Sequence, residues 1–119
     1  MTILVVDDEI GILKILRDIF EPRGWKVVTA PTGEAAFLNM EKEKIDIILL
    51  DIRLPDCSGL EVLKQIKAKY PSIPVIIYTA YGYEDELVNN AIRQGASGYV
   101  SKSVPIKELV EVVNNTMVK

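Results

Sequence analysis

The sequence contains no histidine and a single cysteine, Cys57, among its 119 residues. The absence of histidine excludes histidine-based acid–base chemistry and histidine metal sites. One cysteine cannot form a disulfide within the chain, which fits a reducing compartment. No lysine or arginine adjoins Cys57 in the sequence to stabilise its thiolate, so we expect an inert thiol.

The chain also lacks long apolar runs and an excess of positive charge. No apolar stretch approaches the roughly 20 residues that a membrane-spanning helix needs. The first residues do not show the positive segment followed by an apolar one that marks a secretory signal. The formal net charge of −3 offers no basic surface to a nucleic acid. The sequence therefore predicts a cytoplasmic protein that binds neither membranes nor nucleic acids directly.

What the sequence does contain is an alternation of strand-like and helix-like segments. A length of 119 residues favours one domain over residues 1–119, and 49% hydrophobic residues are ordinary for a globular one. Several predicted strands are continuous apolar runs, which is typical of strands covered on both faces. The predicted strands are Thr2–Val6, Lys26–Ala30, Asp46–Asp51, Pro74–Thr79 and Gly98–Ser101.

Apolar residues at helical spacing follow each strand. The clearest buried faces are Ile12, Ile15, Leu16, Ile19 and Phe20, and Ile106, Leu109, Val110, Val113 and Met117. Shorter patterns lie at Leu60, Leu63 and Ile66, at Leu87, Val88, Ala91 and Ile92, and within residues 33–43. Thr32 and Ser58 are predicted N-caps, Pro105 fits the first turn of the last helix, and Gly24 and Gly95 fit helix ends. Five strand–helix units predict an α/β fold with a parallel sheet and helices on both faces.

Polar side chains follow the strands at the points where the strands end. Asp7 and Asp8 follow the first strand, Asp51 ends the third, Thr79 ends the fourth, and Lys102 follows the fifth. Ligands of an open parallel sheet bind outside the carboxyl ends of its strands. Carboxylates suit Mg²⁺, and a lysine and a hydroxyl suit phosphoryl oxygens. The set predicts a Mg²⁺ and phosphoryl site with a carboxylate available as nucleophile.

Each of these residues also has a purely structural interpretation. Asp8 could cap the first helix, Thr79 could be an ordinary strand residue, and Lys102 could be a solvated loop charge. Five suitable groups from four strand ends are a much rarer accident than any one alone, so the convergence favours a functional site.

Four segments carry a family resemblance: LVVDDE at 4–9, LLDIRLPDCSG at 49–59, IIYTA at 76–80 and GASGYVSK at 95–102. With them the chain resembles the response-regulator receiver domain of two-component signal transduction over nearly its whole length. The resemblance implies a flavodoxin-like, doubly wound sheet of five parallel strands in the order 2-1-3-4-5, with five helices.

The resemblance also implies the chemistry of the site. Asp51 would accept a phosphoryl group from the phosphohistidine of a sensor histidine kinase or of a histidine phosphotransfer protein. Mg²⁺ would be bound by Asp8, by Asp51, by the backbone carbonyl of Arg53 and, directly or through a water, by Asp7. The transfer would depend mainly on positioning and charge neutralisation.

Three further residues complete the implied switch. Lys102 would pair with the phosphoryl group, and Thr79 would hydrogen-bond it and draw in the following loop. Tyr99 would rotate inward, which changes the surface of the fourth helix, fifth strand and fifth helix that a downstream effector protein or domain reads. The protein would be a phosphoacceptor that assists its own phosphorylation and dephosphorylation rather than an enzyme.

The sequence departs from the family pattern after the lysine, where the family usually has a proline and this chain has Ser103. The loop geometry around Lys102 is therefore open. Arg53 and Tyr81 occupy positions that vary in the family and tune the dephosphorylation rate, and Arg53 either approaches the phosphoryl group or is solvated.

Other functions remain alternatives at this point. A Mg²⁺-dependent phosphatase or transferase could use the same aspartate nucleophile, but the dehalogenase-like version needs a second aspartate where this chain has Arg53. A flavin-binding module would need amides and hydroxyls around a phosphate, which Asp7, Asp8 and Glu9 would repel. A degenerate receiver that never accepts phosphate is the third alternative, although all five site residues are present.

Overall fold

Five parallel strands form one sheet in the order β2-β1-β3-β4-β5, as predicted. The protein is described by a computed structural model that covers residues 1–80 and 86–117. The strands are β1 (Thr2–Val6), β2 (Lys26–Ala30), β3 (Ile47–Leu50), β4 (Val75–Thr79) and β5 (Gly98–Ser101). The order reverses between β1 and β3, so the carboxyl ends of these two central strands meet at the crevice where ligands of this architecture bind.

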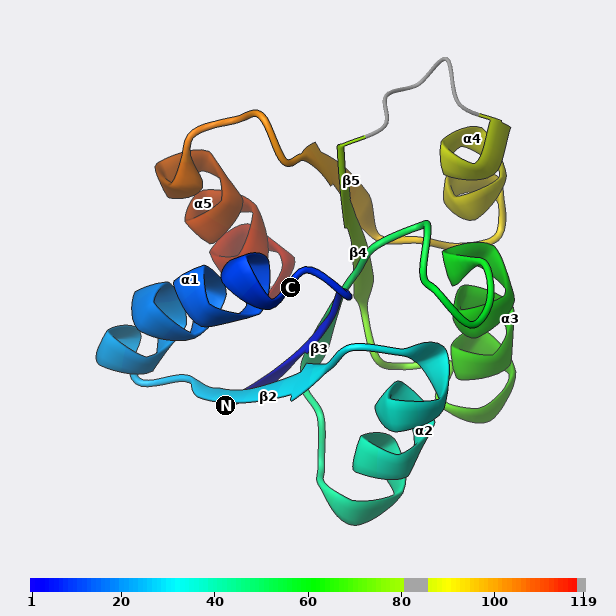
Figure 1. The fold of residues 1–119 in the computed structure, drawn as a ribbon, viewed down its shortest axis with the longest axis horizontal. Coiled ribbons are helices and arrows are strands. Elements are labelled where there is room, and N and C mark those ends of the chain that lie inside the picture. Colours follow the sequence, from blue (N-terminus) through cyan, green and yellow to red (C-terminus); the bar gives the residue numbers. More distant parts are fainter. Residues whose placement is uncertain (81–85, 118–119) are drawn as a thin grey trace.

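Helices cover both faces of the sheet. They are α1 (Ile10–Phe20), α2 (Gly33–Lys42), α3 (Gly59–Lys69), α4 (Glu86–Arg93) and α5 (Ile106–Met117), with a short 3₁₀ helix at Glu21–Arg23. Helices α1 and α5 lie on one face, and α2, α3 and α4 lie on the other (Figure 1). The domain therefore has three layers, with the sheet in the middle.

The two faces of the sheet build two separate cores. On β1, Leu4 and Val6 belong to the core beneath α2, α3 and α4, whereas Ile3 and Val5 belong to the core beneath α1 and α5. All four of these side chains are at most 1% exposed. Because successive side chains of a strand point to opposite faces, a strand covered on both sides must be apolar throughout. This explains the continuous apolar runs of the sequence.

The structure corrects several details of the sequence prediction. β3 and β4 are shorter than predicted, with Asp46, Asp51 and Pro74 lying just outside them. Ile15 and Ile92, predicted on buried faces, are 47% and 39% exposed. On α1 the sheet-facing stripe is Leu13, Leu16 and Phe20. Ile15 falls about 100° around the helix from Leu16, at the edge of that stripe.

Most of the predicted helix signals lie where expected. Thr32 Oγ1 accepts a hydrogen bond from the Ala35 amide at 3.0 Å, and Ser58 Oγ accepts one from the Glu61 amide at 3.3 Å. Gly24 and Gly95 have left-handed φ angles of 92° and 104° after their helices, a conformation that favours glycine. Pro105 directly precedes α5 rather than lying in its first turn.

We predict that two glycine substitutions will change stability in opposite directions. A Cβ on Gly59 would lie 2.3 Å from the Asp51 carbonyl oxygen and 2.6 Å from Ile52 Cα, whereas a Cβ on Gly11 would meet nothing within 4 Å. Gly59→Ala should lower the free energy of unfolding by about 1–3 kcal/mol or more, because backbone must shift. Gly11→Ala, in helix α1, should raise it by about 0.5–1 kcal/mol.

Urea denaturation of both variants and the wild type measures these changes. Equal stability of Gly59→Ala and the wild type would contradict the close approach of α3 to the end of β3.

Candidate functional site

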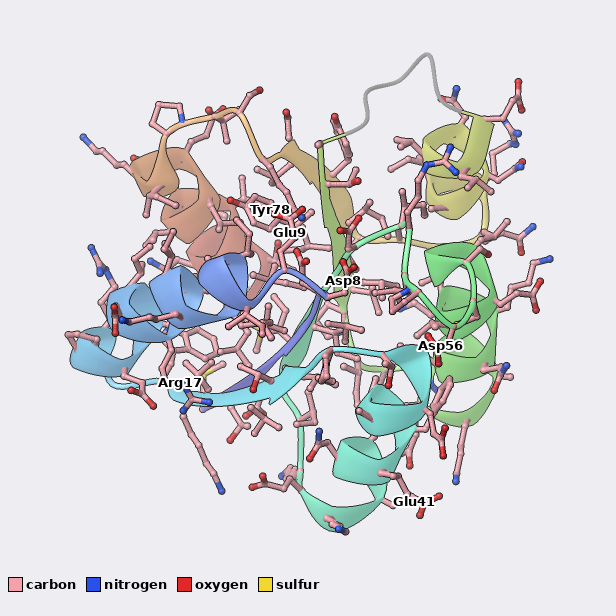
Figure 2. The ribbon with its side chains drawn as sticks, viewed as in Figure 1. Asp8, Glu9, Arg17, Glu41, Asp56 and Tyr78 are labelled. Carbon is pink, nitrogen blue, oxygen red and sulfur yellow. The ribbon has the colours of Figure 1, made fainter. Side chains whose placement is uncertain are left out.

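The candidate site lies at the carboxyl edge of the sheet. A pocket of about 340 Å³ opens there, lined by Asp8, Glu9, Asp51, Arg53, Leu54, Pro55, Thr79, Ala80 and Lys102. Figure 2 shows Asp8 and Glu9 at the end of β1, in the middle of this edge. The lining residues follow four different strands, which the parallel arrangement brings together.

Three aspartates form a cluster in and beside the pocket. Asp7, Asp8 and Asp51 each offer a carboxylate oxygen, and these oxygens lie within 4.8 Å of one another. Asp7 and Asp51 are buried, and Asp8 is exposed. The Asp7 amide donates to the Ala30 carbonyl at 3.0 Å and the Asp51 amide to the Val6 carbonyl at 2.9 Å. Hydrogen bonds to neighbouring strands therefore fix both buried aspartates.

Lys102 supplies the positive charge of the cluster. Its Nζ lies 2.6 Å from Asp7 Oδ2, 3.0 Å from Asp51 Oδ2 and 3.2 Å from Glu9 Oε1, and its side chain is 9% exposed. Burial acts to lower the pKa of Lys102, but the contacts with Asp7 and Asp51 outweigh it and raise that pKa. Lys102 is therefore a fixed ammonium group.

The carboxylate of Asp7 is incompletely satisfied. Its Oδ1 accepts a hydrogen bond from the Glu9 amide at 2.9 Å. Its Oδ2 is buried, and among the described residues its close partner is the Lys102 ammonium, which lies 2.6 Å away as an ion pair. Burial raises the pKa of Asp7, and Lys102 opposes that effect only in part. The energetic cost of this buried charge points to a second cation.

These residues fit a magnesium ion. Asp7, Glu9 and Asp51 share one ammonium, and the Asp8 carboxylate lies in the same cluster, so the cluster carries excess negative charge. Carboxylate oxygens are hard ligands, and Mg²⁺ needs only one or two of them because it keeps several waters. The buried Asp7 oxygen and the exposed Asp8 carboxylate are groups that such an ion would stabilise.

The other predicted site residues border this cluster. Thr79 is fully buried at the end of β4 and lines the pocket. Arg53 also lines it, and the Arg53 amide donates to Asp51 Oδ1 at 3.3 Å. Tyr99 is half-buried on β5 and packs against the core beneath α2, α3 and α4. The alternative role of Asp8 as a helix cap is wrong, because the residue at the N-cap of α1 is Glu9.

Serine hydroxyls form the turn after Lys102, where the family usually has a proline. The Ser103 amide donates to Ser101 Oγ at 3.2 Å, and the two serine hydroxyls lie 2.7 Å apart. A proline could not donate this hydrogen bond. The Lys102 amide also donates to the Thr79 carbonyl at 2.9 Å, which ties the lysine to β4. The peptide bond between Lys102 and Ser103 is trans, as are all those in the described part of the chain.

Two contacts were missed by the sequence analysis. Glu9 forms an ion pair with Lys102. Glu9 belongs to the acidic run after the first strand, but it was not among the predicted site residues. Asp56 accepts hydrogen bonds from the Gly33 and Glu34 amides at 3.1 and 3.2 Å, so the loop after β3 caps helix α2. No pattern in the sequence indicates that Asp56 contacts Gly33 and Glu34, which lie more than twenty residues earlier. Tyr81 lies outside the described residues.

The surroundings of Cys57 in the loop after β3 affect the pKa of its thiol. Burial, followed by the neighbouring Asp56, raises the pKa of the Cys57 thiol. The thiol is therefore protonated at neutral pH and a poor nucleophile, which confirms the prediction of an inert cysteine.

Comparison with known proteins gives the family. The model of the response regulator receiver domain matches residues 3–114. The chain belongs to this family. The receiver is 36% identical to sporulation initiation phosphotransferase F of Bacillus subtilis (strain 168) over 111 residues, which are 93% of this chain and 89% of that protein. A CheY-like receiver domain from Methanospirillum hungatei JF-1 superimposes with a TM-score of 0.92 at 31% identity, covering 98% of this chain and 92% of that one.

Other relatives of the receiver are longer proteins. The probable transcriptional regulatory protein TcrX of Mycobacterium tuberculosis is 34% identical over 111 residues, which are 92% of this chain but 47% of TcrX. The transcriptional regulatory protein ZraR of Klebsiella oxytoca is 39% identical over 107 residues, 90% of this chain and 24% of ZraR. The receiver thus spans about half or less of these relatives.

Among residues 1–80 and 86–117, none of the helices has the length and apolar character to cross a membrane.

We predict that two substitutions in the acidic cluster will shift stability oppositely in metal-free buffer. Among the described residues, Asp8 makes no hydrogen bond or ion pair. Asp8→Asn should therefore only relieve repulsion and raise the free energy of unfolding by up to about 1 kcal/mol. Lys102→Gln should lower it by about 3 kcal/mol, because the buried carboxylates of Asp7 and Asp51 lose their counter-charge.

Urea denaturation with and without MgCl₂ checks both effects. The metal should stabilise the wild type more than Asp8→Asn. A loss of stability in metal-free Asp8→Asn would contradict the excess of negative charge at the site.

Proposed function

We propose that residues 1–119 form one receiver domain that works as a phosphorylation switch in a two-component pathway. In this proposal Asp51 accepts a phosphoryl group from the phosphohistidine of a sensor histidine kinase or of a histidine phosphotransfer protein. The observation that carries it is the shared pocket of Asp8, Asp51, Thr79 and Lys102, with Asp7 directly behind it.

Accessibility favours Asp51 over Asp7 as the nucleophile. Asp51 lines the pocket and is 6% exposed, whereas Asp7 is 1% exposed and does not line it. The Asp51 carboxylate is held at both oxygens, by the Arg53 amide on Oδ1 and by Lys102 on Oδ2. A carboxylate fixed in this way needs no reorientation before it attacks. In the transfer, the bond from phosphorus to the histidine nitrogen breaks as a bond from phosphorus to an Asp51 oxygen forms.

Asp7, Asp8, Asp51 and the Arg53 carbonyl are the groups that would hold Mg²⁺. When bound, the ion would neutralise part of the negative charge that the phosphoryl group adds to an already acidic site. Without such neutralisation the carboxylates would repel an incoming phosphoryl group, so we expect both phosphorylation and dephosphorylation to depend on the metal.

Lys102 and Thr79 would bind the phosphoryl oxygens. The Lys102 ammonium already touches Asp51 Oδ2, so it lies beside the position where a phosphoryl group on Asp51 would lie. A charge-assisted hydrogen bond to a phosphoryl oxygen is about twice as strong as a neutral one. Thr79 adds a hydroxyl at the end of β4, and the hydrogen bond between its carbonyl and the Lys102 amide joins β4 and β5.

This link between β4 and β5 would carry the signal to the surface of α4, β5 and α5. Tyr99 lies half-buried on β5, and in this proposal it changes position when Thr79 and Lys102 are drawn toward a phosphoryl group. A downstream effector protein or domain would then recognise the changed surface. Neither a nucleic acid nor a membrane is part of this proposal, and its setting is the cytoplasm.

A Mg²⁺-dependent phosphatase or transferase is the weaker alternative. Turnover of the dehalogenase type needs a proton donor two residues after the nucleophile, and Arg53 does not serve as one because its guanidinium stays protonated. Among the described residues that line the pocket, no histidine or cysteine replaces that acid. The absence of that acid disfavours turnover of the dehalogenase type, and we propose self-catalysed dephosphorylation of Asp51 instead.

Phosphorylation by acetyl phosphate tests the proposal directly. With MgCl₂, the intact mass of the wild type should rise by one phosphoryl group, and EDTA should prevent the change. Asp51→Ala should remain unlabelled, because the proposed acceptor carboxylate is gone. Asp18→Ala, which removes an exposed aspartate from α1, is the matched control and should label like the wild type.

Two outcomes would contradict the proposal. Equal labelling of Asp51→Ala would place the phosphoacceptor elsewhere. Continued release of inorganic phosphate from an aryl phosphate, beyond one equivalent of protein, would favour the phosphatase alternative.

A further inference from the structure

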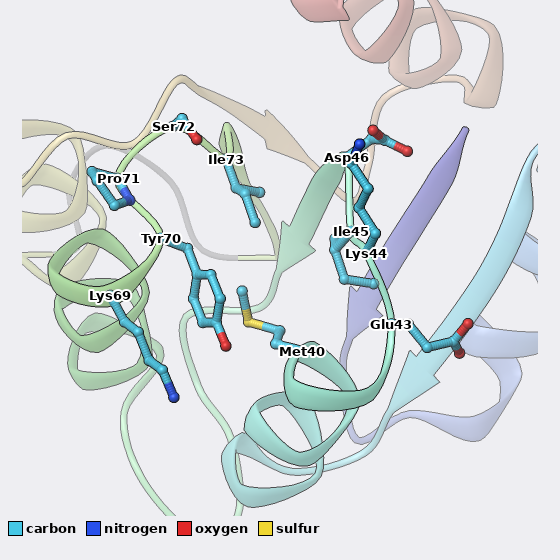
Figure 3. A pocket seen from close by; sticks show the side chains of 10 residues that line it. All are labelled: Met40, Glu43, Lys44, Ile45, Asp46, Lys69, Tyr70, Pro71, Ser72 and Ile73. Atoms are coloured by element: carbon cyan, nitrogen blue, oxygen red, sulfur yellow. The ribbon is translucent and has the colours of Figure 1, made fainter.

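A second pocket lies at the opposite edge of the sheet from the acidic site. It is larger, at about 490 Å³, and lies between the end of α2 with its following loop and the end of α3 with its following loop. Figure 3 shows Tyr70 and Ile73 on one side of it and Met40 and Ile45 on the other. None of its lining residues belongs to the phosphoryl site.

The walls of this pocket are apolar and firmly held. Met40 and Ile45 are each only 5% exposed, and Tyr70 and Ile73 pack against the same core. The Ile73 amide donates to the Tyr70 carbonyl at 3.2 Å, and Lys67 Nζ donates to the Ile73 carbonyl at 3.0 Å. The α3–β4 loop is therefore tied in place, so the pocket is preformed, as small-molecule sites usually are.

The acidic side chains at the rim are engaged elsewhere. Glu43 forms an ion pair with Lys26 on β2, and Figure 3 shows its carboxylate pointing away from the pocket. Asp46 accepts a hydrogen bond from the Thr2 amide at 2.7 Å. The ion pair with Lys26 balances the charge of Glu43, so Asp46 is the one lining carboxylate in the described part of the chain without a cationic partner.

The basic side chains at the rim are not neutralised. Within the described part of the chain, no carboxylate lies within ion-pair distance of Lys44 or Lys69. Lys69 Nζ lies 5.6 Å from the centroid of the Tyr70 ring. Figure 3 shows the Lys69 ammonium and the Tyr70 hydroxyl pointing to the same end of the pocket. That hydroxyl has no hydrogen-bond partner among residues 1–80 and 86–117.

We infer that this pocket binds a small amphiphilic organic anion with a flat apolar body and one carboxylate. The body would pack between the Tyr70 ring and the side chains of Met40, Ile45 and Ile73. The carboxylate would meet the Lys69 ammonium and the Tyr70 hydroxyl, a pairing of cation and neutral donor that suits a carboxylate. Lys44 adds a second positive charge and disfavours cationic ligands.

Two probes of the same ring system but opposite charge test this inference: indoleacetate and tryptamine. Each is titrated into the full chain while backbone amide chemical shifts are recorded. Indoleacetate should shift residues 43–46 and 69–73 and bind at least about tenfold more tightly than tryptamine, as expected if one charged contact is gained and repulsion avoided. Equal affinities, tighter binding of tryptamine, or shifts centred on other residues would each overturn the inference.

Variants separate this pocket from a general attraction of anions. Lys69→Gln and Tyr70→Phe should each weaken indoleacetate binding about three- to tenfold, the effect of losing one polar contact. Lys64→Gln removes the same charge from an exposed position of the same helix, outside the pocket, and should bind like the wild type.

Asp51→Asn should also retain wild-type binding, because the acidic site lies at the other edge of the sheet. Unchanged binding by Lys69→Gln, or loss of binding in Lys64→Gln, would overturn the proposed contact. Amide shifts of each variant without ligand show that the fold is intact.

Discussion

The contact of one buried ammonium group with several carboxylates is the constraint on which the candidate site depends. Lys102 comes from the end of β5, Asp7 and Glu9 from the end of β1, and Asp51 from the end of β3. One positive charge cannot balance all of these negative ones, so the cluster has an affinity for further cations built into it. The same ammonium that holds the acidic side chains together also lies where a phosphoryl group on Asp51 would lie.

The sheet makes this arrangement rigid. Helices cover both faces of the parallel sheet, so the central strands are left uncovered at their ends. The Asp7 amide bonds to Ala30 and continues the pairing of β1 with β2, and the Asp51 amide bonds to Val6 and continues the pairing of β3 with β1. Charge repulsion that would separate two mobile aspartates is therefore opposed by the strand pairing and by the two apolar cores on either side of it.

The sequence predicted the meeting of Asp7, Asp8, Asp51 and Lys102 because the carboxyl ends of parallel strands share an edge. Periodicity did not predict the strand order, which came from the family resemblance. It also misplaced Ile15 and Ile92, since an apolar residue at the margin of a stripe is buried only if a neighbouring element covers it. The contacts of Glu9 with Lys102 and of Asp56 with α2 join elements distant in the sequence, so they required three-dimensional placement.

The hydrogen bonds of Asp56 connect the loop after β3 to the first turn of helix α2. The loop that carries Asp51 also carries Asp56, which accepts from the first two amide groups of α2, and Cys57 lies against Gly33. If this loop leaves its position, two helical donors lose their acceptor at once. The beginning of helix α2 is therefore coupled to the loop that carries Asp51, and amide hydrogen exchange at Gly33 and Glu34 reports on a segment more than twenty residues away along the chain.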